Sequence, residues 1–153
     1  MNERTVVLIK PDAVQRLLAG RILSRFEERG LRIVGLKLVQ VDRSLADRHY
    51  AIHREKPFFG SLVAFITSSP LVAVALEGPN AISVVRTMIG STRPHEAAPG
   101  TIRGDFAIET VLNLVHASDG AETAKSELEL WFTPGELVDY DRALDPWTIA
   151  PAD

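Results

Sequence analysis

His116 stands where a nucleophile could attack a phosphoryl group. In residues 113–119, Asn-Leu-Val-His-Ala-Ser-Asp, an apolar run delivers this histidine to a turn, and a new helix is predicted directly after it. A helix N-terminus favours negative charge through its free N–H groups and its dipole. Imidazole is nucleophilic when neutral, and a large fraction of it is neutral near pH 7. Single histidines are more often surface residues or hydrogen-bond partners, so the hypothesis depends on the neighbours of His116.

Glu127 is the candidate partner of His116. It lies on the helix predicted after the histidine, one residue before Leu128 and four before Trp131, so it falls on or beside the inward face. A carboxylate there needs a partner, because burial without one costs several kcal/mol. A hydrogen bond with His116 would fix one ring nitrogen as the donor and leave the other free to attack. A solvated Glu127 at the edge of the apolar stripe is the alternative.

Three cations lie at the ends of predicted elements or in a long loop, where they could converge on a polyphosphate. Lys10 ends the first predicted strand, Arg86 lies on a predicted helix, and Arg103 lies in the long loop. Each of them taken singly is also typical of a solvated surface charge. Phe58 follows a proline in a turn and could expose its ring to stack on a base, whereas Phe59 is predicted to belong to the core.

Length and composition bound the class of protein. A chain of 153 residues suits a single domain, 1–153, in which residues 133–153 form a C-terminal tail. The formal net charge of -3 disfavours binding of nucleic acid as the main role. Cysteine is absent from the sequence, which excludes disulfides and thiolate metal sites. We expect a cytoplasmic protein without a membrane segment, because we find neither a signal-peptide pattern nor an apolar run of spanning length.

Hydrophobic patterning predicts strands that alternate with helices. Four apolar, β-branched runs predict strands at residues 5–9, 32–41, 71–76 and 112–115. Helical patterns lie at residues 12–15, 21–29, 44–50, 58–66, 80–88 and 119–132. Three residue pairs have the spacing of capping boxes and are predicted to begin helices: Asp12 with Gln15, Ser44 with Asp47, and Asp119 with Glu122. Residues 91–104 have no clear periodicity, and an irregular loop of that length is usually functional.

The order of these elements predicts an α+β fold. Two β-α-β units in one small domain are typical of the ferredoxin-like βαββαβ arrangement. We therefore expect a four-stranded antiparallel sheet with its covering helices on one face, followed by a C-terminal helix and an extended tail. The tail is expected to pack on the domain or on a neighbouring subunit. A flavodoxin-like parallel sheet is the alternative, but the predicted strands are too few for it.

Residues 113–119 resemble the active-site signature of nucleoside diphosphate kinases, Asn-x-x-His-Gly-Ser-Asp. The resemblance covers nearly the whole chain, and the order and spacing of its motifs agree throughout. Besides the signature it includes residues 9–16, His49-Tyr50, Pro57-Phe58-Phe59, Glu77-Gly78, residues 99–106 and residues 122–124. Any one of these motifs is weak, whereas the set is highly specific.

The resemblance implies a role for each site residue. It implies that His116 accepts the γ-phosphoryl group of a nucleoside triphosphate through Nδ1 and passes it to a nucleoside diphosphate in ping-pong order. Glu127 would hold the other imidazole nitrogen, and Ser118 would hydrogen-bond the glutamate. The implied phosphate-binding residues are Lys10, Tyr50, Arg86, Thr92 and Arg103. Asn113 and Lys10 would contact the ribose 3′-hydroxyl, Phe58 would stack on the base, and Leu62 would lie beside that ring.

The resemblance also implies the ligands and the assembly. Mg²⁺ would arrive with the nucleotide and bridge its phosphates, with no metal site built by the protein itself. Substrates would include ATP, GDP and dTDP, with broad base specificity, and the assembly would be a homohexamer, with a tetramer as the alternative. A catalytically silent nucleotide-binding regulatory protein of the same fold is the second hypothesis. A nucleic-acid-binding module is the third, disfavoured by the charge.

Three departures from the family pattern occur: at Ala117, at Gly120, and at Thr110 with Leu112 near the base, where we expect modest effects on nucleotide affinity. Ala117 replaces the glycine that follows the histidine, which would be strained if that position needed a positive φ. We expect a β conformation there instead. Gly120 stands where many members have a serine, so a phosphorylation role for that position does not carry over.

Overall fold

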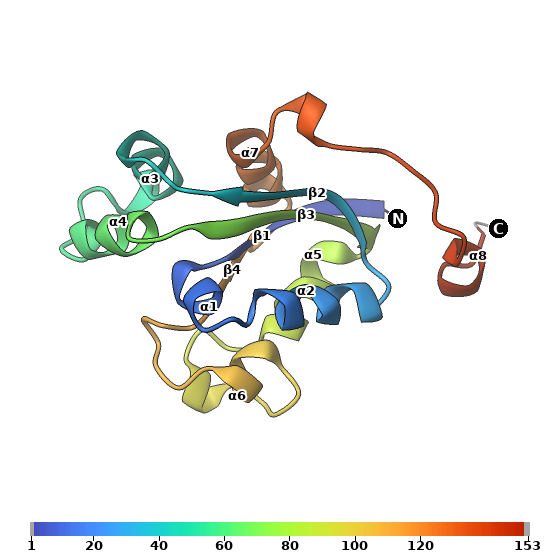
Figure 1. Ribbon diagram of the computed structural model, residues 1–153, viewed down its shortest axis with the longest axis horizontal. Coiled ribbons are helices and arrows are strands. Elements are labelled where there is room, and N and C mark those ends of the chain that lie inside the picture. Colours follow the sequence, from blue (N-terminus) through green and yellow to red (C-terminus); the bar gives the residue numbers. More distant parts are fainter. Residues whose placement is uncertain (1, 152–153) are drawn as a thin grey trace.

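One four-stranded antiparallel sheet organises the fold, as Figure 1 shows for the computed structural model, which describes residues 2–151. The strand order is β2-β3-β1-β4. The strands are β1 (Asn2–Ile9), β2 (Arg32–Val39), β3 (Leu71–Pro79) and β4 (Val115–Ala117). All three pairings are antiparallel, which confirms the ferredoxin-like prediction and excludes the parallel alternative.

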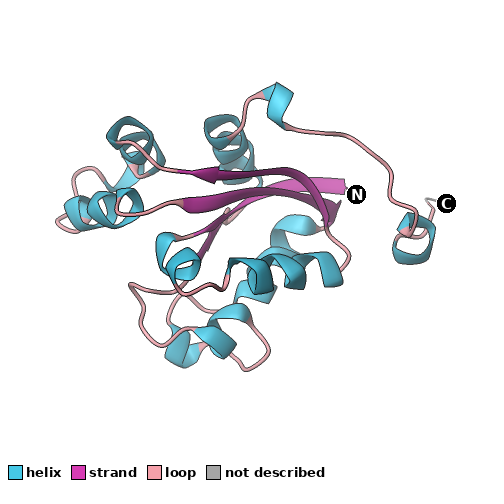
Figure 2. Ribbon diagram, viewed as in Figure 1, coloured by secondary structure: helices cyan, strands magenta, loops and turns pink. Residues whose placement is uncertain are grey.

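Helices cover both faces of the sheet (Figure 2), so the prediction of a single covered face is wrong. One face carries α1 (Pro11–Gln15), α2 (Ala19–Glu28), α5 (Ala81–Ile89) and α6 (Ile102–Phe106). The other carries α3 (Arg43–His49), α4 (Phe59–Thr67) and α7 (Ala121–Trp131). The cause is visible in β1, where Val7 and Ile9 pack into one core and Val6 and Leu8 into the other. An unbroken apolar run of this kind is typical of a strand buried on both sides.

Helix starts differ from the predicted capping boxes. Asp42, not Ser44, caps α3, because its carboxylate accepts the Leu45 N–H at 2.8 Å. The Asp12 carboxylate accepts a backbone N–H from a distant segment, and α7 begins after Gly120 without a side-chain cap. The loop predicted over residues 91–104 contains a short 3-10 helix, Pro94–Glu96, and the start of α6.

The last strand begins three residues later than predicted. Leu114 has a φ of 74°, which an extended strand cannot contain, so pairing starts only at Val115. His116 is therefore the central residue of β4, opposite Leu8 of β1. Because directly opposed residues share a face, the His116 side chain lies on the side of the sheet that α3, α4 and α7 cover.

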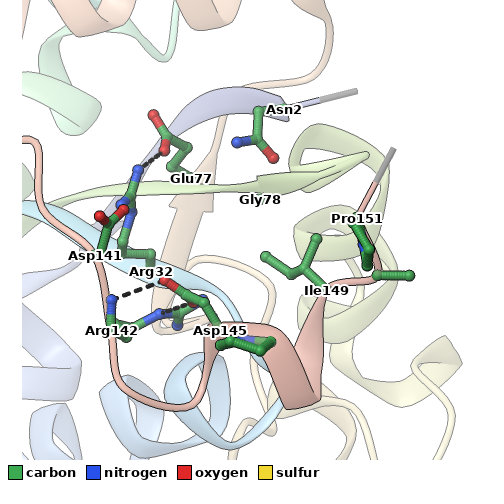
Figure 3. Close-up of a pocket in the computed structure, with 11 residues that line it drawn as sticks. Asn2, Arg32, Glu77, Gly78, Asp141, Arg142, Asp145, Ile149 and Pro151 are labelled. Atoms are coloured by element: carbon green, nitrogen blue, oxygen red, sulfur yellow. Dashed lines mark hydrogen bonds and ion pairs between the residues drawn. The ribbon is translucent and has the colours of Figure 1, made fainter. Parts of the chain in front are cut away.

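The C-terminal tail packs back on the domain, which is one of the two placements predicted for it. After the 3-10 helix Pro134–Glu136, the Val138 N–H donates to Val34 at 2.8 Å, and the chain runs on to α8 (Asp145–Thr148) (Figure 1). A cavity of about 460 Å³ lies between the tail and the end of the sheet. Figure 3 shows two ion pairs at this cavity, Arg32 with Glu77 inside the sheet and Arg142 with Asp145 inside the tail. The tail is held to the domain by Arg142, which donates to the Gly30 carbonyl at 3.1 Å, and by the ion pair of Arg32 with Asp139 at 3.3 Å. Within residues 2–151 every helix is too short or too polar to cross a bilayer.

Candidate active site

The centre of the site is a hydrogen-bonded set of three side chains. His116 Nε2 lies 2.6 Å from Glu127 Oε2, and the Ser118 hydroxyl donates to Glu127 Oε1 at 2.6 Å. Glu127 and Ser118 are buried, while His116 keeps 32% of its side chain exposed. Both carboxylate oxygens are thus engaged, and the solvated alternative for Glu127 is wrong. The pairing of Nε2 leaves Nδ1 as the ring nitrogen available for reaction.

The carboxylate is ionised in this setting. Burial alone would raise the pKa of Glu127, but the hydrogen bond and charge of His116, with the Ser118 hydroxyl, hold that pKa below its ordinary value. Because the pKa is lowered in the fold, Glu127 stabilises the protein above the ordinary value of 4.5, and this contribution is lost as the pH falls below it. A negative Glu127 attracts any positive charge that develops on the imidazole.

His49 is a site residue that the sequence did not predict. Its ring meets the His116 ring edge to face, with centroids 4.8 Å apart, and its side chain is 2% exposed. The Trp131 indole N–H donates to His49 Nδ1 at 3.2 Å. Burial, reinforced by the neighbouring His116, lowers the pKa of His49 to about 3, so the ring is neutral. The one feature that could have indicated a role for His49 is its position in the last turn of α3, directly before Tyr50.

Two imidazoles and a carboxylate also form a set with metal-ligand chemistry. The ligand atoms of His49, His116 and Glu127 all lie within 4.8 Å of one another. Each is already committed, because Trp131 donates to His49 and the other two residues bond each other. The arrangement therefore favours an orienting hydrogen-bond network over a cation site.

Lys10 and Asn113 form a second polar group beside the histidine. The Lys10 ammonium donates to Asn113 Oδ1 at 2.5 Å, and the Asn113 amide donates to the Thr92 carbonyl at 2.9 Å. Burial lowers the pKa of Lys10 to about 8, although Asp12 opposes the shift. Lys10 thus remains mostly protonated at neutral pH, and it loses its positive charge as the pH rises through about 8.

Two arginines approach the strand that carries His116. Arg103 is buried and donates to the carbonyls of Asn113, Gly90 and Val115, at 3.2, 3.1 and 2.7 Å. Burial, with the nearby Arg86, lowers the pKa of Arg103 to about 10. Arg86 donates to the Ala117 carbonyl at 3.3 Å. The structure therefore brings both cations to β4, and their convergence on a polyphosphate stays a prediction.

An aromatic path leads from the histidine to the surface. The Tyr50 ring lies 4.7 Å from that of His49, and the His53 ring lies 6.4 Å from Tyr50 and 5.4 Å from Phe58. Phe58 is 45% exposed, which suits a stacking ring, while Phe59 packs against the core as predicted. Leu62 is half-buried one helical turn after Phe58. Burial and Glu127 raise the pKa of Tyr50 to about 12, so its hydroxyl keeps its proton.

Ala117 adopts the extended conformation that we expected. It lies in β4 opposite Val7, and it is not among the residues with positive φ. The extra methyl group relative to the family glycine therefore causes no backbone strain.

The resemblance implies that His116 is phosphorylated, and Glu127→Gln is expected to slow that step roughly 10- to 100-fold. The neutral amide still fills the space but no longer attracts positive charge on the ring. Single-turnover transfer from ATP measures the rate. Glu129→Gln removes an exposed carboxylate from the same helix and is the matched control. Equal rates for the two variants would contradict the orienting role of Glu127.

The family resemblance implies that Lys10 binds the nucleotide, and its pKa then predicts a loss of nucleotide affinity in alkali. KM for the nucleotide should rise between pH 7 and 9 as Lys10, with its pKa of about 8, loses its charge. The fold itself should not weaken for this reason, because a lowered lysine pKa makes the free energy of unfolding rise between pH 8 and 10.5. Lys10→Arg should flatten the profile, since arginine stays charged. Lys37→Arg, at a surface ion pair with Glu136, should leave it unchanged.

Fold and site together define a class of protein. An antiparallel α+β domain that presents an acid-paired histidine among several cations is the arrangement of a phosphotransferase.

A profile of the nucleoside diphosphate kinase family matches residues 3–137. The chain belongs to the nucleoside diphosphate kinase family and is an enzyme. The nucleoside diphosphate kinase of Roseiflexus castenholzii is 59% identical over 145 residues, which cover 95% of this chain and 97% of that protein. The enzyme of Pyrococcus horikoshii is 56% identical over 147 residues, 94% of each chain.

Solved structures agree with the sequence relatives. A nucleoside diphosphate kinase family protein from Babesia bovis superimposes with a TM-score of 0.93 at 45% identity, covering 95% of this chain and 99% of that one. The halophilic nucleoside diphosphate kinase from Halobacterium salinarum, in complex with CDP, gives a TM-score of 0.92 at 47% identity and covers 97% and 99%.

Proposed function

We propose that the protein transfers the γ-phosphoryl group of a nucleoside triphosphate to a nucleoside diphosphate through a phosphohistidine at His116. The observation that supports this proposal most directly is the 2.6 Å contact of His116 Nε2 with Glu127. It leaves Nδ1 free to react, in a ring that is partly open to solvent. Phosphoryl transfer needs a positioned in-line nucleophile and cations more than it needs acid–base groups. His116, Lys10, Arg86 and Arg103 supply that combination.

The reaction consists of two half-reactions. The Nδ1 lone pair of His116 attacks the γ-phosphorus, and the bond from that phosphorus to the bridging oxygen breaks, with its electrons leaving on the nucleoside diphosphate. An acceptor diphosphate oxygen then attacks the same phosphorus, and the P–N bond breaks to restore the imidazole. Glu127 balances the positive charge on the phosphorylated ring, and the cations stabilise the charge on the transferring group.

The substrate contacts are proposed from the family resemblance, with the exposure of Phe58 in support. Phe58 is proposed to stack on the base, with Leu62 beside it, and stacking tolerates any base. Asn113 and Lys10 are proposed to hold the ribose 3′-hydroxyl, while Tyr50, Thr92 and the two arginines contact the phosphates. The CDP complex of the Halobacterium salinarum relative supports nucleotide binding by this fold. Broad base specificity over ATP, GDP and dTDP follows from recognition by stacking.

Mg²⁺ is proposed to enter with the nucleotide phosphates. The groups that line the site are mainly cations, which suit phosphates, and Glu127 already accepts from His116 and Ser118. The phosphate oxygens and water would therefore hold the ion, which would neutralise part of the phosphate charge.

The assembly is proposed to be a homohexamer, with a tetramer as the alternative. Leu38 on the edge strand β2 is 68% exposed, and Trp147 on the tail is 89% exposed, so both leave apolar surface for a neighbouring copy. Light scattering of the purified protein gives the mass of the assembly. We place the reaction in the cytoplasm, in line with the cysteine-free sequence.

Labelling with γ-³²P-ATP tests the proposal. Intact protein should take up an acid-labile, base-stable label, and added GDP or dTDP should remove it as the triphosphate. A protein that binds nucleotide but takes up no label would instead be the silent regulatory form. The presence of the whole catalytic set disfavours that outcome.

A further inference from the structure

Asp12 connects the first helical turn to the segment that leads into His116. Its carboxylate Oδ2 accepts the backbone N–H of Leu114 at 3.0 Å. The Lys10 backbone N–H donates to the carbonyl of the same Leu114 at 2.8 Å. Both polar backbone groups of Leu114 are therefore bonded to the segment Lys10–Asp12.

The backbone at Leu114 is held in a costly conformation. Its φ is 74°, and the Val115 N–H donates to the Asn113 carbonyl across it at 2.9 Å, which describes a tight γ-turn with a positive central φ. This form of the turn is rare and strained, especially at a bulky residue. Leu114 is fully buried, so the surrounding core holds the residue in this conformation.

A second cost lies at the same junction. Asp12 Oδ1 is buried, and no hydrogen-bond partner for it occurs among residues 2–151. A buried carboxylate oxygen without a partner is unfavourable, and backbone strain persists only where the surroundings enforce it. The strained Leu114 lies two residues before His116, and Asp12 bonds to the same turn. Such coincidences are typical of functional sites.

We propose that Asp12 is a positioning residue for phosphoryl transfer, because its carboxylate locks the Leu114 turn and so aims His116. The turn decides where β4 begins, and β4 places the imidazole against Glu127 at 2.6 Å. The link to transfer rests on the proposed function. The link to the orientation of the ring stands on the geometry alone.

Matched variants separate the hydrogen bond from the charge. Asp12→Ala removes the acceptor for Leu114 and is expected to slow His116 phosphorylation at least tenfold at saturating ATP, with the Kd of ATP changed less than threefold. Asp12→Asn keeps an oxygen in place and should recover the rate to within threefold of wild type. Asp145→Ala removes another carboxylate that accepts a backbone N–H, that of Arg142 at 2.8 Å in the tail, and should leave the rate unchanged. An Asp12→Ala rate within twofold of wild type overturns the proposal.

The strained residue supplies a second test. In the Asp12→Ala background, Leu114→Gly adopts a positive φ without strain, whereas Leu114→Ala loses similar volume but keeps the strain. The glycine variant should therefore be at least threefold faster than the alanine variant. Equal rates would show that the turn is not what Asp12 controls. Thermal unfolding of each variant shows whether it is folded.

The orientation of the ring can be measured without any activity. The ¹⁵N shifts of His116 report whether Nε2 is bonded to Glu127, and we expect that signature in wild type and Asp12→Asn but not in Asp12→Ala. If wild type takes up label and the shifts are the same in all three, the positioning role is wrong and the proposed function stands. If wild type takes up no label, the proposed function fails, and the shifts still decide whether Asp12 aims the ring.

Discussion

Replacement of His116 by alanine is expected to abolish phosphoryl transfer and uptake of label from γ-³²P-ATP. The substitution removes the nucleophile itself, and losses of that kind reach about 10⁴-fold or more. Nucleotide binding should persist, because the proposed phosphate and base contacts come from other side chains. A coupled assay with GDP or dTDP as acceptor measures the rate, and equilibrium titration measures the binding of ATP.

His95→Ala is the matched control for this variant. His95 lies in the loop after α5 with 69% of its side chain exposed, so its removal should leave transfer and labelling at wild-type levels. Label retained by His116→Ala, or activity within tenfold of wild type, would reject the phosphohistidine at this position. Loss of ATP binding in the same variant would point to an unfolded site.

Arg103→Ala is expected to lower both stability and activity. The guanidinium is buried and serves three backbone carbonyls that bracket the site, so its loss leaves them without a charged donor. We expect a loss of about 3 kcal/mol in the free energy of unfolding. For a domain of this size, that corresponds to a fall in Tm of about 6–12 °C. Transfer should also fall, because the contact of Arg103 with β4 and a proposed phosphate-binding cation are lost together.

Arg93→Ala is the control on the same loop region. Its guanidinium is 65% exposed and pairs with Glu96 at 3.6 Å, an ion pair of the kind that contributes little. Thermal unfolding should place Arg93→Ala within about 0.5 kcal/mol of wild type. If Arg103→Ala unfolds at the same temperature as Arg93→Ala, the three carbonyl contacts do not support the site.

The strands and helices were largely predictable because the spacing of hydrophobic residues along the sequence is a local property. Each of the four strands was expected close to where it lies, and β1 and β3 carry unbroken apolar runs. Those same runs contained the information that both faces are covered, which the prediction of one helical layer did not use. The ferredoxin-like topology then followed from the order of elements.

Helix caps and the start of β4 were not predictable in the same way. The carboxylate of Asp12 has the sequence spacing of a cap, yet it bonds Leu114 on a distant segment. No local pattern reveals a positive φ at a buried leucine, because the conformation is imposed by those distant contacts. The predicted strand therefore ended where the observed strand begins.

Within the site, helical spacing placed Glu127 on or beside the inward face and left its pairing with His116 and its solvation as alternatives. The three cations were candidates from the sequence alone, and the family resemblance added their roles. Spacing cannot show that Lys10, Arg86 and Arg103 all bond to residues 113–117, because only the fold brings these three side chains to one segment. His49 was missed because a histidine late in a helix is common, and only the fold places it against His116 and Trp131.

The two tryptophans of the chain sit in opposite surroundings, and that contrast gives the enzyme an optical reporter. Trp131 is 2% exposed, and its indole is bonded to the ring that touches His116, whereas Trp147 is 89% exposed. Substitution of Trp147 by phenylalanine leaves Trp131 as the single tryptophan, with the His49 ring between it and the His116 ring. A dianionic group attached to that nitrogen changes the electric field at the indole, so emission follows each half of the catalytic cycle in real time.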